Sequence, residues 1–122
     1  MWTKAIRGAI TVTENSANAI DAATKELLAA IITENKLKPS AIYSAFFTVT
    51  IDLNATFPAK SARDIGWGNI PMMCSTEIPV PGALAQCIRV MVMFNTLNPF
   101  RTIKHQYLRE AAKLRPDIAE KK

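Results

Sequence analysis

Residues 87–94, CIRVMVMF, constrain the fold of this chain more than any other stretch. Their apolar residues alternate with the two-residue period of a β-strand. One face of this strand carries the branched and aromatic side chains, which are Ile88, Val90, Val92 and Phe94. The other face carries sulfur-containing residues and one charge, Arg89. The pattern predicts a strand in the core of a sheet that holds a single charged side chain.

Arg89 needs an explanation because a guanidinium does not lose its proton, so its burial requires a carboxylate, a phosphate or several carbonyls nearby. A structural explanation is an internal salt bridge to Glu77 or Asp64, or an edge strand on which Arg89 faces water. A functional explanation is an arginine that binds an anionic ligand. Arg7 favours the functional explanation, because it is a second lone cation within a predicted strand.

The rest of the chain alternates between strand and helix patterns. Strands are predicted over residues 4–13, 41–51 and 69–75, and helices over residues 16–35 and 58–64. Gly8 marks a bulge or a close backbone approach in the first strand. Asn15 or Ser16 can cap the long helix, in which apolar residues recur at helical spacing. We expect one domain of mixed α/β class over residues 1–122, since no repeat or linker interrupts it.

The second half of the chain is harder to interpret. Pro81 and Gly82 interrupt regular structure, and a short helical turn is predicted over residues 83–86. Asn98 and Pro99 resemble a helix cap and a first-turn proline. Helix propensity favours a helix through REAAKL. If the segment from His105 is a strand instead, Tyr107 and Arg115 point to the same side.

Charge and cysteine content exclude several classes of protein. The net charge of +5 comes from Lys and Arg residues that are scattered singly along the chain apart from the doublet Lys121-Lys122, which does not favour a nucleic-acid-binding surface. No apolar run approaches the roughly 18 residues needed to cross a bilayer, so the cytoplasm is the expected location. Cys74 and Cys87 are predicted to be free thiols, and with His105 as the one histidine no zinc site is expected.

Several stretches taken together resemble one enzyme family. They are IRGAITV at 6–12, FPAKSAR at 57–63, IPMMCSTE at 70–77, GALAQCIRVM at 82–91 and YLREAAKLRPD at 107–117. In this order they are similar to the monofunctional chorismate mutases of the AroH class, over nearly the whole chain. The most specific combination is Arg7, the spacing from Glu77 to Arg89, and Tyr107 followed by LRPD.

The resemblance implies an isomerase of phenylalanine and tyrosine biosynthesis. Such enzymes convert chorismate to prephenate by an intramolecular Claisen rearrangement, with no covalent intermediate, metal or other cofactor. This agrees with a sequence that offers no catalytic triad and no Gly-rich phosphate loop. The chemistry requires a substrate held in a folded, reactive shape and a donor for the negative charge that develops on the ether oxygen.

The resemblance also implies roles for three catalytic residues. Arg89 would donate to the ether oxygen and to a carboxylate, Arg7 would bind the side-chain carboxylate, and Glu77 would accept a hydrogen bond from the ring hydroxyl. Without the resemblance, Glu77 could be an ordinary surface carboxylate.

The remaining site residues that the resemblance implies contact the substrate: Cys74 beside the ring hydroxyl, Tyr107 on a carboxylate, Phe57 and Leu114 on the ring, and Lys60, Arg63 and Arg115 as a cationic rim. Each has a plainer interpretation. Cys74, Tyr107 and Phe57 could be core residues, and Lys60 and Arg63 could form a solvated helix face.

The fold implied by the resemblance is a mixed β-sheet flanked by helices, assembled as a pseudo-α/β-barrel homotrimer with its sites between subunits. The segment from His105 would then be extended. Apolar residues on both faces of the central strands agree with a sheet covered by helices on one face and a partner on the other. Two other classes remain: a trimeric module that binds a dicarboxylate without catalysis, and a nucleic-acid binder, whose affinity would fall steeply with salt.

Overall fold

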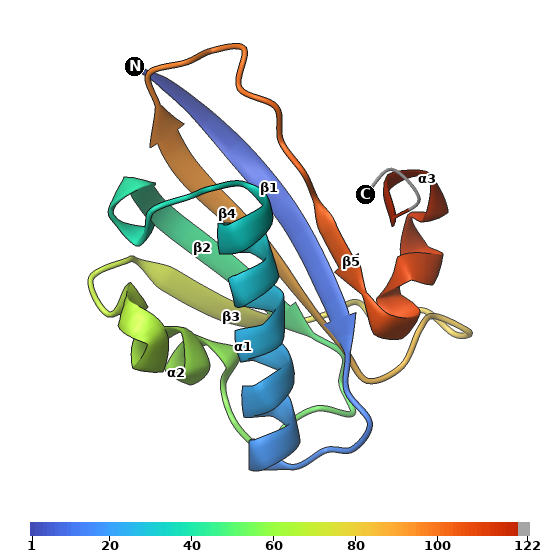
Figure 1. Cartoon of the computed structure of the whole chain (residues 1–122). Helices are drawn as coiled ribbons and strands as arrows, with labels where there is room; N and C mark the ends of the chain where they lie inside the picture. The colour runs from blue at the N-terminus through green and yellow to red at the C-terminus, as the bar shows by residue number, and fades with distance from the viewer. Residues whose placement is uncertain (120–122) are drawn as a thin grey trace.

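The computed structural model describes residues 1–119 and contains a five-stranded mixed sheet with a long helix packed across one face (Figure 1). The strand order is β3-β2-β4-β1-β5. The strands are β1 (Trp2–Thr11), β2 (Ile42–Val49), β3 (Met72–Thr76), β4 (Cys87–Thr96) and β5 (Gln106–Leu108). The helices are α1 (Ala17–Glu34), α2 (Pro58–Ala62) and α3 (Pro116–Ala119), with the short helical segments η1 (Pro39–Ala41), η2 (Arg63–Trp67) and η3 (Arg109–Leu114). The predicted mixed sheet flanked by helices is confirmed.

Strand β4 lies at the centre of the sheet, antiparallel to β1 on one side and to β2 on the other. The face predicted to be apolar packs into the main core, where Ile88, Val92 and Phe94 are fully buried. The alternation therefore predicted this strand and its orientation correctly. Arg89 lies on the opposite face of β4. Because β4 pairs with a strand on each side, the alternative that Arg89 sits on an edge strand is wrong.

Helix α1 supplies the other half of the core. Ser16 caps its N-terminus, because the Ser16 Oγ accepts a hydrogen bond from the Ala19 N–H over 3.1 Å. The buried face of α1 packs tightly on the sheet at Gly8, where an added Cβ would lie 3.0 Å from Ile31 Cδ1 and 3.1 Å from Leu27 Cδ1. The predicted close backbone approach at Gly8 is confirmed.

Two predicted helical turns are absent. Residues 83–86 form no helix: the chain bends there, and Gln86 adopts a left-handed φ of 48° while its carbonyl accepts from the Val12 N–H. Asn98 begins a tight turn rather than a helix, in which its side-chain oxygen accepts from the Phe100 N–H. At Asn98 the side chain that was expected to cap a helix is used by the local turn instead.

The segment after His105 combines both expectations. It is extended only over β5, which pairs in parallel with β1 and satisfies the outer edge of that strand. Arg109 then adopts a left-handed φ of 55°, and REAAKL forms the 3-10 helix η3. Helix propensity therefore governs the chain only after the edge of β1 has been paired.

The sheet face opposite α1 is only partly covered. Near β1 and β5, η3 packs on this face through a small second core that includes Ala9, Cys87 and Ala111. Further across, Phe46 pairs with Met91 on one side and Met73 on the other, and all three side chains are exposed. An apolar patch therefore lies on the uncovered half of the sheet.

Candidate active site

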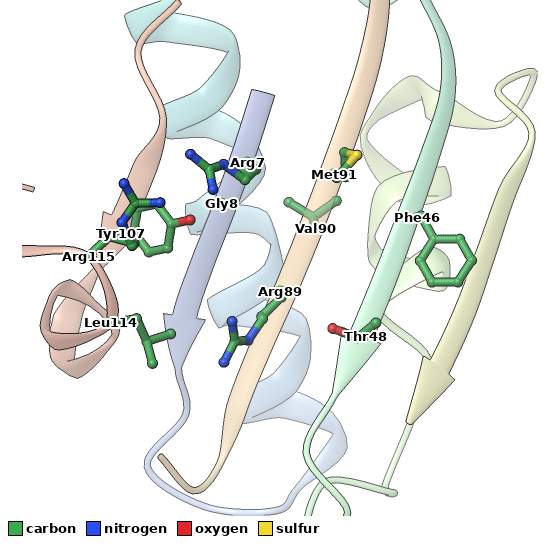
Figure 2. Close-up of a pocket in the computed structure, with 10 residues that line it drawn as sticks. All are labelled: Arg7, Gly8, Phe46, Thr48, Arg89, Val90, Met91, Tyr107, Leu114 and Arg115. Atoms are coloured by element: carbon green, nitrogen blue, oxygen red, sulfur yellow. The ribbon is translucent and has the colours of Figure 1, made fainter. Parts of the chain in front are cut away.

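A pocket of about 340 Å³ opens on this second face, between the central strands and the C-terminal segment (Figure 2). Its lining residues are Arg7, Gly8, Phe46, Thr48, Arg89, Val90, Met91, Tyr107, Leu114 and Arg115. Five of the ten were predicted from the sequence as site residues: Arg7, Arg89, Tyr107, Leu114 and Arg115.

Strand register brings these residues together. Ala9 pairs with Arg89 on β4 and with Tyr107 on β5, so the three share one face of the sheet. Arg7 lies two residues before Ala9 and therefore faces the same way. Figure 2 shows the guanidinium groups of Arg7, Arg89 and Arg115 on this side, with the Tyr107 ring beside Arg115. Four strands, the helical segment η3 and the residue that follows it thus build a cationic pocket.

Arg89 is fixed by the carboxylate of Glu77, which does not itself line the pocket. Its Nε lies 3.1 Å from Oε1 of Glu77, and the Thr48 hydroxyl donates a hydrogen bond to the same oxygen. The predicted salt bridge between Glu77 and Arg89 is therefore present, whereas Asp64 pairs with Lys25 and Lys60 instead. A guanidinium has five N–H donors, so Arg89 keeps donors for a ligand while Glu77 holds it in place.

The other two arginines, Arg115 and Arg7, differ in whether a nearby carboxylate neutralises their charge. Arg115 forms a two-point contact with Asp117, with Nε to Oδ1 at 3.1 Å and Nη2 to Oδ2 at 2.9 Å. This hydrogen bonding raises the pKa of Arg115. Within residues 1–119, by contrast, no ion pair involves the guanidinium of Arg7. Arg7 therefore contributes a positive charge to the pocket that no described carboxylate offsets.

His105 holds the backbone of a residue that lines the pocket, because its Nδ1 accepts a hydrogen bond from the Arg7 backbone N–H over 2.9 Å. The pKa of His105 lies below its usual 6.5, first because of desolvation and then because Arg7 and Arg115 are nearby. The neutral imidazole is the form that can accept this hydrogen bond. The expectation that His105 is structural rather than catalytic fits this contact.

We therefore expect the stability of the protein to fall as the pH drops below about 6.5, where the unfolded chain takes up a proton that the folded imidazole resists. Above that range the contribution of His105 is complete. His105→Asn keeps an acceptor for the Arg7 N–H but does not titrate, so its stability relative to the wild type should rise between pH 6.5 and pH 5. Denaturant unfolding at several pH values measures this difference, and parallel pH profiles for the two proteins would contradict it.

The remaining predicted residues lie outside this pocket. Phe57 and Cys74 line a separate hollow of about 300 Å³, in which Phe57 is 68% exposed and is therefore not a core aromatic. Cys74 is half-buried and packs against the main core, as its plainer interpretation expected. Lys60 and Arg63 lie on α2 and at the start of η2. In the single chain the predicted site residues therefore do not form one site, and Lys60 and Arg63 line neither of the two hollows.

Sequence reasoning missed five of the lining residues: Gly8, Phe46, Thr48, Val90 and Met91. Thr48 matters most, because its hydroxyl orients Glu77. Its even separation from Phe46 in a predicted strand placed the two on one face. No local pattern shows that β2 pairs Thr48 with Arg89.

The described residues offer neither a metal site nor a membrane-spanning helix. In residues 1–119, no three His, Cys, Asp or Glu side chains cluster closely enough to hold a metal ion. No helix in the same part of the chain has the length and hydropathy to span a membrane. The buried Cys87 has its pKa raised to about 11 by desolvation, so it is a thiol at neutral pH.

Fold and site together define a protein with a mixed sheet and an arginine-lined pocket whose charge suits a small anion. Residues 3–118 match the family model of chorismate mutase type I. The chain belongs to the type I chorismate mutase family. The predictions of family and of isomerase function are thereby confirmed.

Individual relatives agree with this assignment. Chorismate mutase AroH of Thermus thermophilus is 45% identical over 116 residues, covering 94% of this chain and 95% of the relative. Chorismate mutase AroH of Bacillus subtilis (strain 168) is 42% identical over 120 residues, covering 98% and 94%. A solved structure of a chorismate mutase from Clostridium thermocellum superposes with a TM-score of 0.86 at 48% identity, covering 93% of this chain and 99% of that one.

Proposed function

We propose that this chain isomerises chorismate to prephenate in the arginine-lined pocket, with Arg89 as the main catalytic residue. The observation that carries the proposal is the position of Arg89: it projects into the pocket from the central strand, and Glu77 and Thr48 hold it there. A donor fixed before the reaction need not reorganise during it, which is the condition for strong stabilisation of developing charge.

The reaction asks little else of the protein. In one step the ether carbon–oxygen bond of the substrate breaks and a carbon–carbon bond forms, and no proton or electron leaves the molecule. The Arg89 guanidinium donates to the ether oxygen as negative charge develops on it. Arg7 and Tyr107 hold the substrate carboxylates, and Leu114 packs on the ring, so the substrate stays in its reactive shape.

Glu77 has two tasks in this proposal. Its Oε1 is occupied by Arg89 and Thr48, so it fixes the catalytic guanidinium. Within the described part of the chain no hydrogen bond uses its Oε2. This second oxygen is available for the ring hydroxyl of the substrate.

We further propose that the active protein is a homotrimer, each chain one domain over residues 1–122, with each site between two subunits. Charge supports this arrangement, because the substrate carries two carboxylates while Arg89 and Arg115 are already paired with Glu77 and Asp117. In one chain that leaves Arg7 as the uncompensated cation of the pocket. Arg63, which has no ion pair within residues 1–119, can supply another from a neighbouring subunit.

The hollow that contains Phe57 and Cys74 supports the same arrangement. Phe57 is 68% exposed in the single chain, and burial against another subunit would remove this large aromatic side chain from water. In an interface site it closes over the substrate ring, with Cys74 close to the ring hydroxyl and Lys60 at the rim. The exposed patch of Phe46, Met73 and Met91 gives the subunits an apolar surface to bury.

Purified protein tests the function directly. Chorismate absorbance should decay without added metal or nucleotide, and prephenate should be the product. Light scattering should give three times the chain mass of 13.4 kDa. Binding of a dicarboxylate without turnover would show a non-catalytic module instead, and an inert trimer would contradict the proposal. A cytoplasmic location stays a prediction.

Arg63→Ala tests the contribution of the neighbouring subunit. We expect the Michaelis constant to rise about tenfold with little change in turnover, because one charge-assisted hydrogen bond of about 1.5 kcal/mol is lost. Lys38→Ala is the matched control, since it removes an exposed cation that lines none of the pockets described. Equal Michaelis constants for the two variants would make Arg63 an ordinary surface charge.

A further inference from the structure

The wall of the pocket formed by the C-terminal segment has little backbone support. Tyr107, Leu114 and Arg115 all come from this segment. Its pairing with the sheet is limited to the three residues of β5. After Leu108 the chain leaves the sheet, so Leu114 and Arg115 depend on other contacts for their position.

Arg109 supplies such contacts. Its Nη1 donates to the carbonyl of Thr11 over 3.0 Å, and its Nη2 lies 2.8 Å from Oε1 of Glu26 on α1. Next to it, the Glu110 N–H donates to the Thr11 hydroxyl over 3.2 Å. The Arg109 side chain therefore connects the start of η3 to the end of β1 and to the helix α1.

The backbone of Arg109 points to the same role. Its φ of 55° lies in the left-handed region, which residues with a side chain enter rarely and glycine enters freely. An arginine at such a position gains nothing from its backbone. The side-chain contacts of Arg109 to Glu26 and Thr11 can offset the free-energy cost of this backbone conformation.

We propose that Arg109 is a positioning residue: its clamp on Glu26 and Thr11 sets the segment that holds Leu114 and Arg115 against the pocket. The inference rests on the proposed function for its effect on the reaction. Arg109 does not line the pocket, so it acts through the position of these two residues. Loss of the clamp should weaken substrate binding more than the chemical step, because Arg89 stands on β4 and is held independently.

Arg109→Gly removes the clamp while suiting the local backbone. We expect the Michaelis constant to rise roughly tenfold, below the ~100-fold that a full ångström of misplacement can cost, with turnover within about threefold of the wild type. Lys113→Ala is the control, because it removes the exposed ion pair with Glu110 from the same helical segment. It should leave both constants unchanged.

Two further measurements separate positioning from a general loss of structure. Glu26→Ala combined with Arg109→Gly should be no worse than Arg109→Gly alone, since both changes break one contact. Amide hydrogen exchange should quicken over residues 109–115 in Arg109→Gly and stay unchanged in β4. An unchanged Michaelis constant together with unchanged exchange would overturn the proposal. An inactive wild type whose exchange still depends on Arg109 would support the clamp and refute the proposed function.

Discussion

Arg89→Gln should lower turnover by roughly two to three orders of magnitude, because one preorganised donor aimed at developing charge typically contributes about 2.7–4 kcal/mol. Substrate affinity should change less, since Arg7 and Tyr107 still bind the carboxylates. The fold should be unaffected: Arg89 is on the outer face of β4 and its side chain is 44% exposed. Steady-state kinetics with circular dichroism as a check on folding makes the measurement.

The ion pair with Glu77 complicates that variant, because Arg89→Gln leaves a bare carboxylate in a pocket meant for a dianion. The double variant Glu77→Gln with Arg89→Gln removes this repulsion. It should regain affinity but remain as slow as Arg89→Gln alone, since the donor to the ether oxygen is still missing.

Arg89→Lys asks whether charge alone is enough. Lysine keeps the charge but loses the planar fork, which lets one guanidinium contact Glu77 and the substrate together. We expect a substantial loss of turnover here too. Full activity in Arg89→Lys would show that another residue performs the catalysis.

Gly8→Ala should lower the free energy of unfolding by about 2 kcal/mol, within the 1–3 kcal/mol typical of an overpacked core. The new methyl group would lie 3.0 Å from Ile31 Cδ1 and 3.3 Å from the backbone oxygen of Gln106. The Ile31 side chain can turn, but the Gln106 carbonyl belongs to β5 and must move with its strand. Since β5 carries Tyr107, we expect a raised Michaelis constant as well.

Gly68→Ala is the control for this change, because it adds the same methyl group where nothing lies within 4 Å and φ is −60°. It should stabilise the protein by about 0.4–1 kcal/mol through the unfolded chain. Denaturant unfolding at one fixed protein concentration compares both variants with the wild type, since association contributes to apparent stability. Equal stabilities for the two alanine variants would mean that α1 and β1 are not in close contact at Gly8.

Patterns within a short stretch of sequence predicted the helix and strand that depend mainly on the residues of that stretch. Helix α1 follows from the Ser16 cap and the spacing of its apolar residues, and β4 follows from its alternation. The segment after His105 could not be derived in this way. Its sequence favours a helix, yet the unpaired edge of β1 makes three of its residues a strand. Only the family resemblance pointed to that extended segment.

The site shows the same division. Arg7 and Arg89 stood out as lone charges in apolar strands, which identified both without a structure. Their proximity depends on the register between β1 and β4, which pairs Ala9 with Arg89 and leaves no trace in either strand alone. Arg109 was hidden for a different reason: it lies in a stretch of strong helix formers, where nothing signals a left-handed residue.

The strand order also determines when the pocket can exist during synthesis. Strand β1 is synthesised well before its neighbours β4 and β5, because α1, β2, α2 and β3 lie between them in the sequence. The hydrogen bond from the Arg7 backbone N–H to the His105 imidazole joins residues that are 98 positions apart. A sheet whose strands are far apart in the sequence folds slowly compared with a helical bundle. The entropy cost of bringing distant segments together comes before the stabilising contacts between them form. The pocket can therefore form only after the segment that contains β5 and η3 has been translated.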